Sequence, residues 1–204
     1  MNAKPSLFTG RLLLAAAVIL TGGALQETAA QQRYTQTVGE NMWNCGRNVN
    51  GLRLNPSKEN ISFAQLCGHA RYGGFHASNE SSAMTGFGAL AKTVTWFPNV
   101  SMAGSFSFSQ ERGTGMDGSM FIHPGYYPVD VLEFTPGTKI LQEYSFTGGL
   151  AADISEHWKA GASVSYEASN YAKRKDIRHT NYALDLEVVP SFMYSSGDFS
   201  AGLS

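Results

Sequence analysis

The sequence predicts an all-β protein, an antiparallel up-and-down transmembrane β-barrel that is incomplete, with about six to seven strands in this chain. Three observations support this prediction. Apolar residues recur at every second position over several stretches, turn-forming residues separate these stretches, and only 15% of the residues are charged. A period of two places successive side chains on opposite faces of a strand, and an apolar face opposite a small polar face is typical of strands that meet lipid.

The clearest alternation lies between Tyr144 and Tyr194, in three runs that cover residues 144–154, 158–168 and 182–194. In the first run, Phe146 and Leu150 share a face, and Ser145 and Thr147 point to the other face. We interpret the three runs as consecutive strands of a barrel.

The remaining strands are less regular. We expect them at residues 61–77, 83–97 and 100–110, with a last strand that begins at Asp198. Residues 111–141 are rich in Gly and Pro and read as a long irregular loop, with one short strand possible at 129–134. The connections at 98–99, 155–157 and 195–197 are short, whereas those at 111–141 and 171–179 are long. This alternation suits short periplasmic turns and long external loops.

Aromatic residues stand near the ends of the expected strands and favour a girdle at the two membrane interfaces. They are Trp96, Phe97, Trp158, Tyr166, Tyr182 and Tyr194.

The N-terminus has the pattern of a signal peptide over residues 1–30. Lys4 and Arg11 precede an apolar run, and Ala29-Ala30 offers a cleavage site. An uncleaved anchor is the alternative, but the run falls short of the ~20 residues that span a bilayer. Residues 31–60 form a polar lead-in, either periplasmic or plug-like, and residues 61–204 form the partial outer-membrane barrel. The expected localisation is the outer membrane.

Six to seven strands would leave two open edges, which lipid does not tolerate. We therefore expect the chain to be the N-terminal fragment of a longer barrel. Closure with other chains is the alternative.

Several motifs follow one another from Tyr126 onward in a distinctive order. They are Tyr127-Pro128-Val129-Asp130, Glu143-Tyr144, Trp158-Lys159-Ala160-Gly161, Tyr166-Glu167-Ala168 and the basic run from Lys173 to Asn181. This order resembles an outer-membrane β-barrel family of Bacteroides-type bacteria that is known only as domain of unknown function 6850. The resemblance covers about residues 61–204, with Ile177 where proline is expected. It implies barrels considerably longer than this chain, and it brings no catalytic residue.

The two cysteines, Cys45 and Cys67, could form a disulfide in an oxidising compartment or remain unpaired. Neither has neighbours with the spacing of a zinc site, so no metal and no cofactor are expected.

A basic run is the only dense cluster of charge, and it is expected in an external loop. Its binding candidates are Lys173, Arg174, Lys175, Arg178 and His179. They could bind lipopolysaccharide phosphates or an anionic solute, or form a solvated loop that Asp176 partly neutralises. Outer-membrane lipid is therefore the expected partner. The formal net charge of −1 gives no reason to expect nucleic acid.

Residues that a hydrolase could use are present but scattered, namely His123, His157, His179, Asp130, Glu133, Ser109 and Glu111. Nothing in the sequence places a nucleophile, a base and a carboxylate together. Gly113, Gly115 and Gly118 match a dinucleotide-binding spacing, but no strand–helix unit follows, so the match is a coincidence.

The sequence thus predicts an outer-membrane barrel fragment with a structural, channel or transport role. A barrel hydrolase and a secreted all-β binding protein are the alternatives.

Overall fold

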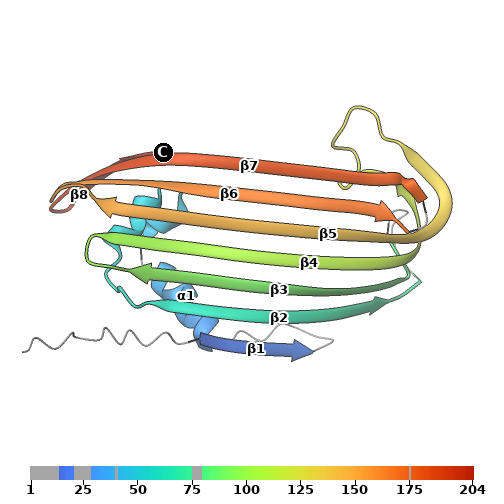
Figure 1. Ribbon diagram of the computed structural model, residues 1–204, viewed down its shortest axis with the longest axis horizontal. Coiled ribbons are helices and arrows are strands. Elements are labelled where there is room, and N and C mark those ends of the chain that lie inside the picture. The colour runs from blue at the N-terminus through green and yellow to red at the C-terminus, as the bar shows by residue number, and fades with distance from the viewer. Residues whose placement is uncertain (1–13, 21–28, 40, 75–79, 175) are drawn as a thin grey trace, which may run out of the picture.

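The computed structural model describes residues 14–20, 29–39, 41–74, 80–174 and 176–204. These residues form a single sheet with three short helical elements on one side of it (Figure 1). The strands are β1 (Leu14–Leu20), β2 (Ile61–Tyr72), β3 (Ala83–Trp96), β4 (Val100–Ser119), β5 (Leu132–Asp153), β6 (Trp158–Lys173), β7 (Asp176–Ser196) and β8 (Phe199–Leu203).

Strands β2 to β8 are antiparallel, and each pairs with the next along the chain, so the prediction of an all-β, up-and-down sheet is confirmed. In the part of the chain that the structure describes, the sheet is not closed. β1 runs parallel to β2 and falls within the expected signal peptide. Residues 1–13 and 21–28 of that stretch lie outside the described residues, and the signal peptide stays a prediction.

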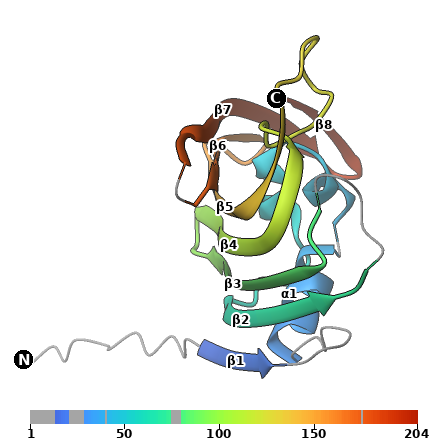
Figure 2. The same ribbon diagram turned by 90° about the vertical axis from the view of Figure 1, so that its right-hand side faces the viewer.

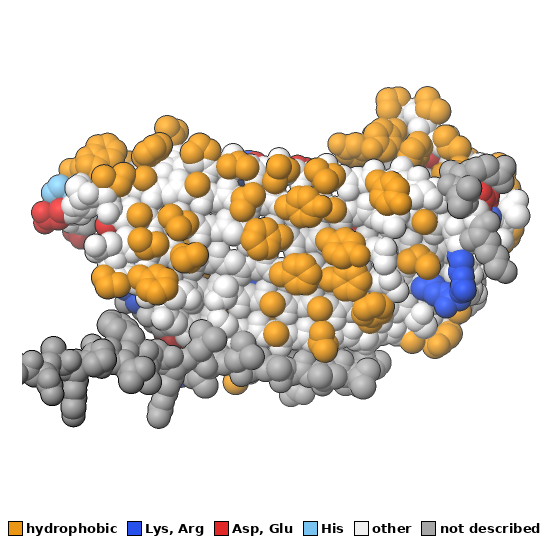
Figure 3. Space-filling model, viewed as in Figure 1, with side chains coloured by type: hydrophobic (Ala, Val, Ile, Leu, Met, Phe, Trp, Pro, Cys, Tyr) orange, Lys and Arg blue, Asp and Glu red, His pale blue; other side chains and the backbone are white. Residues whose placement is uncertain are grey.

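The sheet curves around the helical elements, so it has a concave and a convex face (Figure 2). Consecutive cross-strand partners on the convex face are apolar: Phe106, Phe146, Tyr166 and Leu186. The row one residue away faces the concave side and is polar: Ser105, Thr147, Ser165 and Glu187. Aromatic and aliphatic cross-strand pairs stabilise the sheet, and the period-two pattern keeps the two surfaces separate. Figure 3 shows hydrophobic side chains spread over the convex face.

Residues 29–60, the N-terminal segment, lie against the concave face. The segment contains helix α1 (Ala29–Gly39) and the 3-10 helices η1 (Met42–Cys45) and η2 (Val49–Leu54). Its many asparagines cap these turns, since Asn41 accepts from the Trp43 N–H at 2.9 Å and Asn48 from the Asn50 N–H at 3.1 Å. This placement agrees with the plug-like alternative.

A hydrophobic core lies between the N-terminal segment and β2–β3, and its buried members are Leu52, Ile61, Val94 and Trp96. The N-terminal segment also contacts β7 and β8, at the opposite edge of the sheet. The Asn48 amide donates to the Phe192 carbonyl of β7 at 3.1 Å and to the Leu203 carbonyl of β8 at 3.2 Å. One side chain thus links the N-terminal segment to the last hairpin.

Trp96 is not at a membrane interface, so that prediction is wrong. The pairing of β3 turns Trp96 toward the concave side, where it is 7% exposed and its indole Nε1–H donates to the Leu52 carbonyl at 2.8 Å. Trp158 and Tyr182, which lie on the convex face, are 53% and 74% exposed.

The prediction of an irregular stretch over 111–141 is also wrong. β4 continues to Ser119, β5 begins at Leu132, and only residues 120–131 form the loop. Register shifts interrupt the pairing near Met116, and Gly115 and Gly118 have φ of +70° and +84°. These glycines form bulges that only glycine adopts readily, which explains both the glycine-rich sequence and the coincidental dinucleotide spacing.

The long basic loop predicted over residues 171–179, between what the structure shows as β6 and β7, is absent as well. β6 extends to Lys173 and β7 begins at Asp176, so the connection is only residues 174–175. The two strands are longer than predicted because charged residues in them face the concave side, where they find partners.

Cys67 is half-buried on β2, whereas the side chain of Cys45 lies outside the described residues, so their disulfide stays a prediction. No described helix has the length and apolar character needed to cross a bilayer.

Candidate functional site

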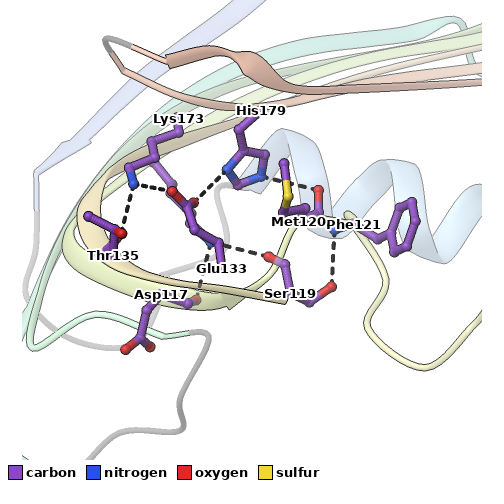
Figure 4. Close-up of polar contacts among 9 residues, drawn as sticks. Asp117, Ser119, Met120, Phe121, Glu133, Thr135, Lys173 and His179 are labelled. Atoms are coloured by element: carbon purple, nitrogen blue, oxygen red, sulfur yellow. Dashed lines mark hydrogen bonds and ion pairs between the residues drawn. The ribbon is translucent and has the colours of Figure 1, made fainter. Parts of the chain in front are cut away.

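A polar cluster lies at the end of the sheet where the 120–131 loop connects β4 and β5, which we call the loop end (Figure 4). The cluster, called the loop-end cluster below, consists of Glu133, Lys139, Tyr171, Lys173 and His179. The pairing of β5 with β6 brings three of these residues together. Lys139 is opposite Lys173, and Tyr171 is opposite Leu141, two residues along β5 from Lys139.

Glu133 is at the centre of the cluster. Its Oε1 accepts a short hydrogen bond from the Lys173 ammonium, which also donates to the Thr135 carbonyl at 2.7 Å. Its Oε2 is 3.3 Å from Nδ1 of His179. The side chain of His179 is 1% exposed and that of Lys173 is 10% exposed, so the carboxylate is held in a largely dry site. The hydrogen bond from Lys173 lowers the pKa of Glu133 below its ordinary value.

His179 joins the cluster to the loop. Its Nε2 is 3.1 Å from the Met120 carbonyl, which can only accept, so Nε2 carries a proton and donates. Burial, followed by the charge of Lys139, lowers the pKa of His179, while the Met120 carbonyl and Glu133 oppose this shift.

Lys139 is 1% exposed and secures the bulged end of β4. Its ammonium donates to the carbonyls of Asp117 at 3.2 Å and Ser119 at 3.1 Å, and it lies 5.5 Å from the centre of the Tyr171 ring. Burial lowers the pKa of Lys139 and raises the pKa of Tyr171 to about 12. The bulges leave these carbonyls without regular sheet partners, and the lysine satisfies them.

Side-chain and backbone hydrogen bonds close the base of the loop. The Ser119 hydroxyl donates to Asp130 at 2.8 Å and accepts from the Phe121 N–H at 3.0 Å. The Met120 N–H donates to the Val131 carbonyl at 2.9 Å. Together with the loop-end cluster, these bonds hold the 120–131 loop in a fixed position beside the concave face.

The loop covers a cavity of about 580 Å³ on the concave face. The floor contains three carboxylates from β5, β6 and β7, namely Glu143, Glu167 and Asp185, with serines around them, and the loop contributes His123, Tyr126 and Tyr127. We call this the carboxylate cavity. A second cavity, of about 420 Å³, lies between the N-terminal segment and the sheet. Within the described part of the chain, no group of three or more His, Cys, Asp or Glu side chains could hold a metal ion.

The predicted basic binding residues do not act as one group. Lys173 and His179 face Glu133 in the interior, whereas Arg174 is exposed and its N–H donates to the Thr138 carbonyl at 2.8 Å. Lys175 and the side chain of Arg178 lie outside the described residues. Anion binding by these residues stays a prediction.

The hydrolase candidates are also divided among different places. Glu133 and His179 meet, Asp130 binds Ser119, Ser109 binds Glu143, and His157 lies in the turn at the opposite end beside the Ser195 carbonyl. Lys139 and Tyr171 were not singled out from the sequence. Both occupy alternate positions of their strands that face the concave side. This was the only signal in the sequence, and it can be recognised only when the strands are known to extend this far.

These features define an open, up-and-down antiparallel β-sheet protein with its N-terminal segment inside the concavity and a loop fixed over one end. A family model described as "Family of unknown function (DUF6850)" matches residues 51–204, and the chain belongs to this family. No curated protein and no solved structure matches the chain significantly.

Proposed function

We propose that this chain forms part of a transmembrane β-barrel in the outer membrane of Bacteroides-type bacteria, with a structural, channel or transport role. The observation that carries the proposal is the division of the sheet into two surfaces. The convex face is apolar across adjacent strands, whereas the concave face is polar and holds the N-terminal segment. An extensive exposed apolar surface is unfavourable in water and favourable against lipid.

The size of the apolar surface also suits a bilayer. On β7, Tyr182 and Tyr194 bracket an apolar row of Leu184, Leu186, Val188, Pro190 and Phe192. The distance between the two tyrosines is roughly 40 Å along the strand, or roughly 30 Å across a membrane at a tilt of about 40°. This spans the ~25 Å apolar band of a barrel together with its aromatic girdles.

A polar row ends the band at the loop end. The Gln142 amide donates to Gln110 at 2.7 Å, and the Asn170 amide donates to Gln142 at 3.3 Å, across β4, β5 and β6. Asn170 is opposite Tyr182, so the amide row and the tyrosine stand at the same level. The loop-end cluster lies beyond this row, outside the proposed membrane-spanning segments.

The open edges are part of the proposal. In lipid, every backbone N–H and C=O needs a protein partner. Removal of the predicted signal peptide would take away β1 and expose the edge of β2, so the edges of β2 and β7–β8 must pair with further strands in the membrane. The expected pairing closes the barrel around the N-terminal segment.

The test uses adjacent residues of β6 that face opposite ways. Val164→Lys places a charge on the convex face near the middle of the band, at a cost of about 2–4 kcal/mol in lipid, whereas Ser163→Lys places the same charge on the concave face. We expect Val164→Lys to abolish a heat-modifiable band in membrane fractions and Ser163→Lys to retain it. A wild-type chain that is monomeric in buffer without detergent would overturn the proposal.

A further inference from the structure

The N-terminal segment covers the concave face near one end of the sheet, opposite the 120–131 loop (Figure 1). We call this the turn end, since the short turns at residues 97–99, 154–157 and 197–198 lie there. We infer that the segment is a fixed plug that closes the lumen of the barrel at the turn end and blocks passive flow through it. This inference rests on the proposed barrel function, because only a closed barrel has a lumen.

The segment reaches across the concave face from β2 to β8. On β2, the ring of Phe63 lies edge-on to the ring of Tyr34 in α1, with their centres 5.6 Å apart. In the middle of the sheet, Arg53 forms its ion pair with Asp153 of β5. At the other side, the Asn48 amide donates to carbonyls of β7 and β8. The segment therefore spans the whole concavity at the turn end, which is the position that a plug requires.

Two glycines on neighbouring strands, which we call the glycine seat, receive the segment. Gly149 of β5 and Gly161 of β6 face the concave side, and Val49 of η2 lies against both. A Cβ atom at Gly149 would be 2.6 Å from Cγ2 of Val49, and one at Gly161 would be 2.6 Å from Cγ1. Carbon atoms pack at about 3.5–4.0 Å, so a side chain at either position would displace the segment. The fit of the sheet to η2 thus depends on the absence of these two side chains.

Buried polar side chains hold the segment in one position. Asn50 is fully buried, and its amide donates to Oδ1 of Asn48 at 3.0 Å and to the Ser191 hydroxyl of β7 at 3.1 Å. Arg53 is 7% exposed and has its partners on the sheet. Withdrawal of the segment would break these hydrogen bonds together, and buried polar groups that lose their partners are costly. This favours a plug that stays in place over a loosely attached tail.

The segment leaves the loop end of the concave face uncovered. The described residues that line the carboxylate cavity come from β4 to β7 and the 120–131 loop, and none belongs to the N-terminal segment. In a closed barrel the lumen is then a vestibule that opens at the loop end and is blocked at the turn end. A solute crosses only when the segment leaves the glycine seat, so the inferred route is gated.

Gly149 and Gly148 provide a matched pair of variants, because Gly148 faces the convex side. A Cβ atom at Gly148 would be 3.4 Å from its nearest neighbour, an ordinary contact with Phe146. In the full chain folded in detergent, we expect Gly149→Ala to speed amide hydrogen exchange of residues 48–53 by about tenfold or more, and Gly148→Ala to leave it unchanged. Addition of Val49→Ala to Gly149→Ala removes both methyl groups from the seat and should slow the exchange again.

Wild-type exchange in residues 48–53 for Gly149→Ala would overturn the seat, and so would fast exchange that Val49→Ala does not slow. Exchange in residues 162–172 of β6 shows whether the variant sheet is folded. A measurement on the wild type alone guards against variants that do not fold. Residues 48–53 should exchange as slowly as β6 in the wild type, and exchange within seconds would contradict a fixed plug.

Ion current across a planar lipid bilayer tests the block itself. The wild type and Gly148→Ala should carry no steady current, whereas Gly149→Ala should open about tenfold more often than either. A steady current through the wild type would overturn the plug, as would unchanged current in Gly149→Ala despite its faster exchange.

Failure of the proposed function gives a different result. If the wild type is monomeric in buffer without detergent, the barrel and the block fall together, while hydrogen exchange still decides whether the seat holds the segment. A heat-modifiable band from a wild type that conducts freely would leave the barrel standing and overturn the plug alone.

Discussion

Arg53 in the N-terminal segment forms an ion pair with Asp153, which stands one hundred positions later at the end of β5. The guanidinium side chain is 3% exposed and also donates to the carbonyls of Phe97 and Pro98 and to the Ser101 hydroxyl. A single side chain thus joins the segment to the β3–β4 turn and to β5. This geometry uses the planar, multi-donor shape that lysine lacks.

Arg53→Ala should therefore destabilise the protein markedly, by about 3 kcal/mol, because it leaves a carboxylate and two carbonyls without their donor. Denaturant unfolding would measure the change. Arg47→Ala is the matched control. Arg47 forms an ion pair with Glu187 at 2.6 Å, but its side chain is 73% exposed. An exposed ion pair contributes less than about 1 kcal/mol to stability. Similar losses in both variants would contradict a special role for Arg53.

The loop-end cluster should make stability sensitive to acid. The pKa of His179 lies below its ordinary 6.5 because of burial, so the unfolded chain takes up this proton more readily than the folded one. The contribution of uncharged His179 to the free energy of unfolding is therefore complete above pH 6.5. It is lost as the pH falls through the lower pKa that His179 has in the folded protein. Unfolding midpoints between pH 7.5 and 5 should decline in the wild type and decline less in His179→Gln. A steeper decline in the variant would refute this assignment.

Lys139→Met should loosen the loop more than the sheet. The apolar side chain fills the space but leaves the Asp117 and Ser119 carbonyls unpaired, at a cost of about 1–3 kcal/mol. Limited proteolysis should then cut within residues 120–131 faster than in the wild type. Lys159→Met, at the opposite end of β6, should leave the rate of cleavage in this loop unchanged.

Trp96→Phe tests the inward orientation of this residue. The change keeps an aromatic ring but removes the 2.8 Å hydrogen bond to the Leu52 carbonyl, which should cost about 1 kcal/mol of unfolding free energy. If Trp96 faced lipid instead, the substitution would be nearly neutral. Tryptophan fluorescence of this position should also resist a membrane-bound quencher.

The sequence predicted the antiparallel strands β2 to β8 and their order, but not β1, because apolar and polar residues alternate regularly in the stretches around Phe106, Phe146 and Leu186. The prediction failed where the alternation of side chains between the two faces is interrupted. Near Gly115 and Gly118 the bulges shift the register, and the same glycines are common in loops, so the sequence alone could not separate the two.

The loop-end cluster was only partly visible for a related reason. Lys173 and His179 stood out as charges in an assumed loop, but their meeting with Glu133 depends on the pairing of three strands. Lys139 is a lone lysine among apolar and polar neighbours, and its burial follows only from the bulged carbonyls opposite it. Such contacts between distant residues have no local sequence signal.

The two hydrogen bonds of Asn48 have a consequence for the order of folding. They connect residues that are 144 and 155 positions apart, so they cannot form until the β7–β8 hairpin exists. Contacts of such separation slow folding, because a long loop must close before they form. The N-terminal segment is synthesised before β7 and β8 but reaches its final place only after them, and its docking reports that the β7–β8 hairpin has formed in register.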